Sequence, residues 1–207
     1  MRTFPLVLLL ALPAAAVIVD RAAITVGDRV ITDSEVDLRI RLTAFQNGEK
    51  PEVNPSSRKR AAELLIDQKL IEREMDVGHY PRLSEDGRKE LLAGFAKAQF
   101  QSNPKALDQA LTGYGLTGAD LEDDLARQSD LLTFLSLRFR PAVQVSDQQV
   151  QEYYRNVLTK GQTTLNDLRG QIEDKLTGER ADTDMESWLL EQRKRTKIQY
   201  LEKDLAP

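Results

Sequence analysis

Sequence typical of β-strands occurs only near the two ends of this chain, which restricts the folds open to it. Residues Val17 to Val26 are mostly small or β-branched, Gly27-Asp28 supplies a two-residue turn, and Arg29-Val30-Ile31 resumes the extended pattern. Near the other end, Thr196 to Leu201 alternates polar and apolar residues. A lone strand leaves its backbone groups unsatisfied, so we expect the C-terminal strand to pair with the N-terminal hairpin.

Helical periodicity fills the chain between these ends. Thr32 is followed by Glu35 at the spacing of a capping box, which predicts a helix start. The second predicted helix runs from Pro55 to about Val77, where Gly78 is expected to end it in the left-handed conformation. Further helices are predicted to start at Ser84, Pro104, Thr117 and Ser146, and the last third predicts one helix, or two joined near Gly178. The expected fold is mostly α, with one small sheet.

Two of these helices carry long apolar stripes that we expect to face the core. In the second helix the stripe is Ala61, Leu64, Leu65, Gln68, Ile71 and Met75. In the helix that follows Thr117 it is Leu121, Leu125, Leu132, Leu135 and Phe139.

The first sixteen residues have the three-part pattern of a secretory signal. A positive start at Met1-Arg2 precedes an apolar run from Phe4 to Leu12, and Ala14-Ala15-Ala16 supplies small residues for cleavage. A membrane anchor is the alternative, but the run is about half the ~20 residues that a span needs. We therefore expect cleavage near Ala16, a mature chain of 191 residues from 17 to 207, and a periplasmic protein without stable membrane insertion.

Composition excludes several classes of function. The chain has no Cys and one His, which rules out disulfides, Cys-based zinc sites and any mechanism with two imidazoles. The net charge of −4 does not favour a nucleic-acid partner. No triad, phosphate-binding loop or dinucleotide fingerprint is present, so we expect no catalytic residues, no cofactor and no metal.

Four short features have the composition of a binding or catalytic site, but each has a plainer structural interpretation. His79 is expected on a surface turn. Glu122-Asp123-Asp124 suits the first turn of a helix, with Asp123 paired to Arg127 four residues on. Asp182, Asp184 and Glu186 lack the glycine and distant glutamate of a calcium loop. The basic run Arg193-Lys194-Arg195 with Lys197 complements a helix C-terminus.

Five segments, in order, resemble the SurA-type periplasmic chaperones. They are Val19 to Thr32, Leu64 to Ile71, Gly115 to Leu125, Val145 to Tyr154, and Trp188-Leu189 together with Thr196 to Leu201. The resemblance implies a cradle of helices sealed by the terminal strands, distantly like the chaperone part of trigger factor. In that family a parvulin prolyl-isomerase domain usually follows the paired tyrosines. Here only ten residues separate Tyr154 from Leu165, too few for such a domain.

The resemblance therefore implies a chaperone module without its enzyme. It would consist of a hairpin and helices over 17–156, with a C-terminal helix and strand over 165–202 that pack back on them. The implied function is ATP-independent binding of unfolded outer-membrane or secreted proteins. The alternative is a structural or assembly module that docks one specific periplasmic partner, as a dimer with exchanged helices. Residual prolyl isomerase activity is a third hypothesis, which we expect to be wrong.

Aromatic residues of the central helices are the candidates for client contact, because a chaperone binds apolar chains on an exposed apolar surface. They are Phe95, Phe100, Tyr114, Phe134 and Phe139. Core packing is the alternative for each of them. Trp188 lies at helical spacing with Met185, Leu189 and Leu176, which favours a place in the core.

Overall fold

The two ends of the chain meet in a three-stranded antiparallel sheet with the order β2-β1-β3. Strand β1 (Ala22–Val26) pairs with β2 (Arg29–Thr32) on one side and with β3 (Ile198–Tyr200) on the other. Ile24 lies opposite Tyr200, and the Gly27 N–H donates to the Lys197 carbonyl at 2.9 Å. The predicted pairing of the C-terminal strand with the hairpin is confirmed.

A computed structural model describes residues 20–157 and 164–206, so the predicted signal peptide lies outside the described residues. The described part of the chain is mostly helical, as expected. Its helices are α1 (Asp33–Asn47), α2 (Pro55–Val77), α3 (Glu85–Phe100), α4 (Pro104–Gly113), α5 (Gly118–Arg138), η1 (Arg140–Ala142), α6 (Asp147–Val157), α7 (Leu165–Arg195) and η2 (Lys203–Leu205). None of the helices in this part of the chain is long and apolar enough to cross a membrane.

Side-chain caps fix most helix starts at the predicted positions. Thr32 accepts from the Glu35 backbone N–H, and the Glu35 carboxylate accepts from the Thr32 N–H at 2.8 Å. Thr117 forms the same reciprocal box with Asp120, and Ser84 caps α3. The last third is one continuous helix: α7 passes through Gly178 without a break and is about 46 Å long at 1.5 Å per residue.

Gly78 ends α2, but not in the left-handed conformation, so that prediction is wrong. Its φ is −84°, and the left-handed residue is His79 with φ +53°. Gly78 is required for a different reason: a Cβ there would lie 2.5 Å from Cε2 of Tyr80 and 3.1 Å from the Glu74 carbonyl. The glycine therefore makes room for the Tyr80 ring to fold back on the end of α2.

Three apolar clusters hold the elements together. The first lies between the sheet, α1 and α2, and includes Ile24, Ile31, Val36, Ile66 and Leu205. The second joins α1 to α4 and the start of α5, and includes Leu42, Phe45, Leu111 and Leu121. The third lies where α2, α5 and α7 meet, and includes Ile71, Met75, Phe134, Phe139 and Ala181.

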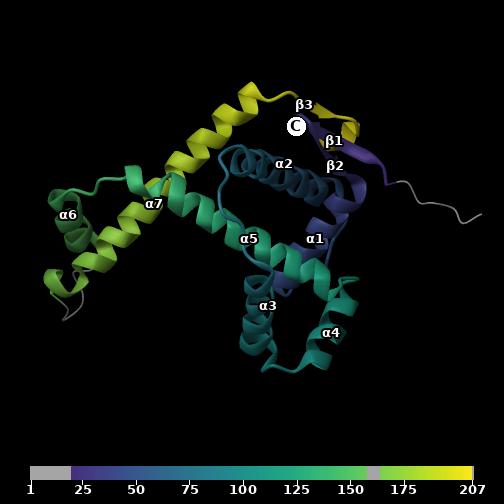
Figure 1. The fold of residues 1–207 in the computed structure, drawn as a ribbon, viewed down its shortest axis with the longest axis horizontal. Coiled ribbons are helices and arrows are strands. Elements are labelled where there is room, and N and C mark those ends of the chain that lie inside the picture. The colour runs from purple at the N-terminus through teal and green to yellow at the C-terminus, as the bar shows by residue number, and fades with distance from the viewer. Residues whose placement is uncertain (1–19, 158–163, 207) are drawn as a thin grey trace, which may run out of the picture.

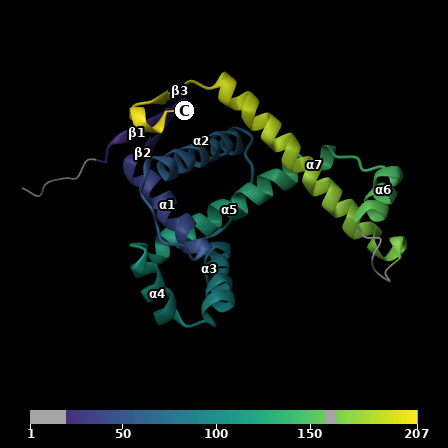
Figure 2. The same cartoon turned by 180° about the vertical axis from the view of Figure 1, so that it is seen from behind.

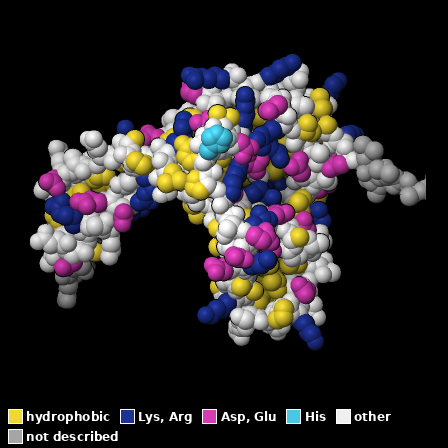
Figure 3. All heavy atoms as spheres, in the orientation of Figure 1, with side chains coloured by type: hydrophobic (Ala, Val, Ile, Leu, Met, Phe, Trp, Pro, Cys, Tyr) yellow, Lys and Arg dark blue, Asp and Glu magenta, His cyan; other side chains and the backbone are white. Residues whose placement is uncertain are grey.

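The elements are arranged as a body with two projections (Figure 1). The body contains the sheet, α1, α2 and the crossing part of α5. The α3–α4 pair projects from it on one side, and α6 with the N-terminal half of α7 forms an arm on another, as the reverse view also shows (Figure 2). Hydrophobic side chains gather between α3 and α4, and charges of both signs cover the body (Figure 3).

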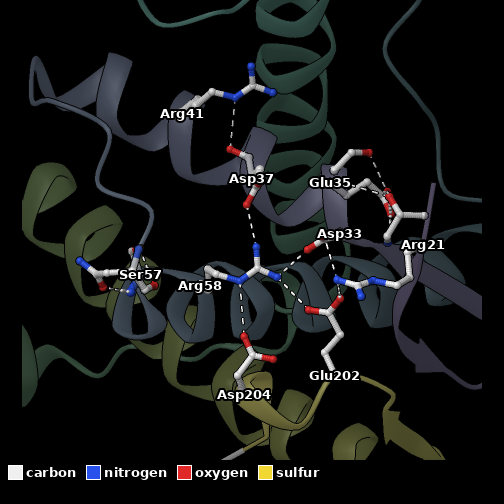
Figure 4. A network of polar contacts seen from close by, with 12 residues as sticks. Arg21, Asp33, Glu35, Asp37, Arg41, Ser57, Arg58, Glu202 and Asp204 are labelled. Carbon is white, nitrogen blue, oxygen red and sulfur yellow. Dashed lines mark hydrogen bonds and ion pairs between the residues drawn. The ribbon is translucent and has the colours of Figure 1, made fainter. Parts of the chain in front are cut away.

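A network of ion pairs, which we call the C-terminal clasp, ties the last residues to the body (Figure 4). The Arg58 guanidinium of α2 lies 2.5 Å from Asp33, 2.8 Å from Asp37 and 2.9 Å from Glu202. The hydrogen bond to Asp33 is the main cause that raises the pKa of Arg58. Beside the clasp, Leu205 is only 1% exposed in the first apolar cluster, so residues 202–205 are a structural part of the body.

Candidate functional site

A cleft of about 240 Å³ opens where α1, α2, α5 and α7 converge. Apolar side chains from three of these helices line it: Leu64, Ile71, Met75, Leu131, Met185 and Leu189. Polar and charged side chains surround them: Arg39, Asp67, Gln68, Glu72, Arg82, Asp124, Arg127, Gln128 and Asp130. The cleft is therefore an apolar surface bordered by charges of both signs.

The spacing of residues along α2 places them in this cleft. Leu64, Gln68, Ile71 and Met75 follow one another at three- and four-residue steps and so share one face of the helix. Ile71 and Met75 are buried against the third apolar cluster, but Leu64 is 55% exposed. The prediction that Leu64 faces the core is wrong, because Leu64 lines the open cleft instead.

A second groove of about 460 Å³ continues along α2 towards its N-terminus. Ile40, Ala61 and Leu64 line it, so Leu64 belongs to both this groove and the cleft. From Ser57, which also lines the groove, to Met75 the α2 face extends for about 27 Å at 1.5 Å per residue. An extended polypeptide of about eight residues has the same length at 3.3 Å per residue.

Asp124 lies at the cleft with no exposed surface, and its carboxylate is held by side chains from two helices. Arg39 of α1 approaches it at 2.8 Å, and the amides of Gln46 and Gln128 donate to it at 2.8 Å each. Arg127 lies 3.5 Å away on the same helix. These contacts fix α5 to α1 and give the cleft a rigid polar border.

The prediction that Asp123 pairs with Arg127 is wrong. Asp123 pairs with Arg88 of α3, and Arg127 pairs with Asp124 instead of Asp123. Neighbours on one helix can be found from spacing, but Arg39 lies 85 positions away in sequence and only the fold brings it to Asp124. Two features do signal the site: an Asp next to the apolar stripe of α5, and an Arg on the inner face of α1.

The five aromatic candidates fall into two separate places. Phe95, Phe100 and Tyr114 are half-buried around Phe45 in the α3–α4 projection, with ring centroids 5.4 to 6.4 Å from that of Phe45. Phe134 and Phe139 are buried in the third apolar cluster instead. None of the five lines the cleft.

Trp188 packs in the third cluster, as the spacing favours. Its ring lies 5.5 Å from that of Phe134 and 6.1 Å from that of Phe139. The Arg138 guanidinium lies over all three rings, at 5.6 to 6.0 Å from their centroids, and pairs with Glu74 at 3.0 Å. This cation–π arrangement closes the junction of α5 and α7.

His79 and the three acidic residues near Asp182 do not form a site in the described part of the chain. His79 is exposed on the turn after α2, and Asp182, Asp184 and Glu186 lie within the continuous helix α7. No group of three or more His, Asp or Glu side chains in the described part of the chain is placed to hold a metal ion.

Arg193, in the basic run, anchors the end of α7 to α2. Its guanidinium lies 2.5 Å from Glu63 and 2.6 Å from Asp67. Burial by itself lowers the pKa of Arg193, but the hydrogen bonds to Asp67 and Glu63 outweigh it and raise the pKa above its usual value. The run therefore lies in the last turn of α7, as predicted, and its Arg193 also binds two carboxylates of α2.

No protein-family model and no curated protein sequence matches this chain. The resemblance to SurA-type chaperones therefore depends on the five sequence segments alone.

Proposed function

We propose that this protein is an ATP-independent holdase that binds unfolded outer-membrane or secreted polypeptides after export. The observation that carries the proposal is the cleft at Leu64, whose apolar surface is open to solvent and bordered by charges of both signs. An unfolded chain exposes apolar side chains that such a surface takes up, while the surrounding charges keep the complex in solution. The SurA resemblance and the predicted export signal point in the same direction.

In this proposal the half-buried Phe95, Phe100 and Tyr114 of the α3–α4 projection form a second client contact. Phe134 and Phe139 are core residues and take no part in it. No covalent step is involved, because binding alone lowers the concentration of free unfolded chain. We expect no prolyl isomerase activity in a peptide assay.

Light scattering during dilution of an unfolded outer-membrane barrel tests the proposal. The mature protein at several-fold excess is expected to suppress the rise in scattering. Leu64→Asp places a charge in the cleft and should weaken suppression. Leu132→Asp is the matched control: the prediction that Leu132 faces the core is wrong, since it is 64% exposed on α5 and lies outside the cleft. No suppression by the unaltered protein, or equal loss in both variants, counts against the proposal.

A specific assembly module is the second candidate, favoured by the arm that α6 and α7 extend from the body (Figure 1). An element that projects in this way is suited to exchange between two copies or to docking on one partner. Size-exclusion chromatography with light scattering would give a dimer mass, and a pull-down would give one stoichiometric partner. Such results, without suppression of aggregation, would favour this candidate over the holdase.

A further inference from the structure

The arm contains a groove of about 590 Å³ that is separate from the cleft. One wall is the connection between η1 and α6, which contributes Val143, Gln144 and Val145. The other wall is α7, which contributes Leu176 and Thr183. The connection leads from η1, close to α7, to α6, as the reverse view shows (Figure 2).

The connection is extended at Val143 and is not paired with any strand in the described residues. Val143 has extended angles of φ −79° and ψ 128°, and residues 143–146 contain no turn or bend. The Val143 N–H donates to the Arg140 carbonyl, and the Ser146 N–H donates to the Gln149 side chain. Between them, the N–H groups of Gln144 and Val145 have no hydrogen bond within the described residues. Extended backbone of this kind is completed by a second extended backbone.

The charge of the arm restricts which chain can lie there. Between Arg140 and Glu186 the described residues carry nine acidic and five basic side chains. Two of the acidic ones, Glu179 and Asp184, line the groove, and they pair with Lys175 and Arg180, so the net negative charge is that of the arm as a whole. An extended segment with net positive charge is therefore attracted, and an acidic segment is repelled.

We propose that a basic, extended polypeptide segment adds as a strand to residues 143–146 and places an apolar side chain against Val143, Val145 and Leu176. The inference deepens the proposed function, because an unfolded client is the source of such a segment. In an extended strand the N–H and C=O of one residue point to the opposite edge from those of the next. Only one of the two free N–H groups, that of Gln144 or that of Val145, can therefore bond to the added strand.

Amide hydrogen exchange of the mature protein, followed by NMR, tests this. The probe is an eight-residue peptide that alternates Val and Lys, and its control alternates Val and Glu. The Val-Lys peptide is expected to slow exchange at least fivefold at one of the two amides and to leave the other unchanged. No slowing at either amide, slowing at both, or equal binding of the Val-Glu peptide overturns the inference.

Two proline variants provide the matched comparison, because proline removes the N–H donor. The extended angles of Val143 are those that the residue before a proline adopts, so Gln144→Pro is compatible with the residue that precedes it. Hydrogen exchange identifies which of the two amides, Gln144 or Val145, the peptide protects. The proline variant at that position should weaken peptide binding about two- to tenfold, because it removes one hydrogen bond. Equal affinity of both variants and the unaltered protein overturns the inference.

The light-scattering assay separates this inference from the proposed function. Suppression of aggregation without protection of either amide leaves the holdase standing and removes the strand-addition site. Protection of one amide by the basic peptide, without suppression of aggregation, supports the groove as a peptide site and counts against the holdase.

Discussion

Removing the Asp124 carboxylate should destabilise the protein more than any neighbouring acidic change. In Asp124→Ala the Arg39 guanidinium, whose side chain is only 15% exposed, loses its 2.8 Å partner, and two glutamine amides lose their acceptor. Breaking a buried pair in this way costs about 3–5 kcal/mol in the free energy of unfolding. At roughly 2–4 °C per kcal/mol for a chain of this size, the melting temperature should fall by about 6–20 °C.

Urea unfolding followed by far-ultraviolet circular dichroism measures the change, and Trp188 fluorescence provides a second probe at the α5–α7 junction. Asp123→Ala is the control, because Asp123 is half-exposed and its pairing with Arg88 is worth about 1 kcal/mol or less. The double variant Asp124→Leu with Arg39→Met removes both charges and should recover more than about half of the loss. A cost below about 1 kcal/mol for Asp124→Ala would refute the structural role given to this cluster.

Three further changes test other parts of the structure. Leu205→Ala should cost about 2–5 kcal/mol in urea unfolding, because Leu205 is fully packed in the first cluster. Gly27→Ala should cost about 1–2 kcal/mol in the same assay, since φ there is +62° and a new Cβ meets only ordinary contacts. Hydrogen bonds from Arg82 and Arg29 lower the pKa of Asp76 below 3.8, so its stabilising effect is lost as pH falls through the folded value. Asp76→Asn should therefore flatten the fall in stability below about pH 4.

Local chemistry made most of the fold predictable. The Gly27-Asp28 turn, the Thr32–Glu35 capping box and the caps at Ser84 and Thr117 are determined by residues a few positions apart, and the structure has each of them. The pairing of the C-terminal strand was predictable for a different reason. A strand needs a partner, and the only other strand-like sequence lies at the opposite end.

The candidate site was less predictable, because it depends on contacts between residues far apart in sequence. The periodicity of α2 places Leu64 on its apolar face, but only the tertiary arrangement of the helices shows that it stays exposed. Asp124 resembles a first-turn acid until Arg39 is brought to it from α1. The cap position of Gly78 suggested a left-handed residue, whereas the close approach of Tyr80 explains the glycine. The C-terminal clasp also depends on contacts between distant residues, because Arg58 binds Asp33 near one end of the chain and Glu202 near the other.

Site-specific photo-crosslinking gives the most direct test that the cleft binds unfolded chains. A photoreactive amino acid is placed at position 64 in one variant and at position 132 in another, and each is mixed with an unfolded outer-membrane barrel. Both positions are exposed on helices, but only Leu64 lies in the cleft. We predict a strong crosslink to the barrel from position 64 and little from position 132. Suppression of aggregation without a crosslink from position 64, or with equal crosslinks from both positions, would contradict the proposal that the cleft binds unfolded chains.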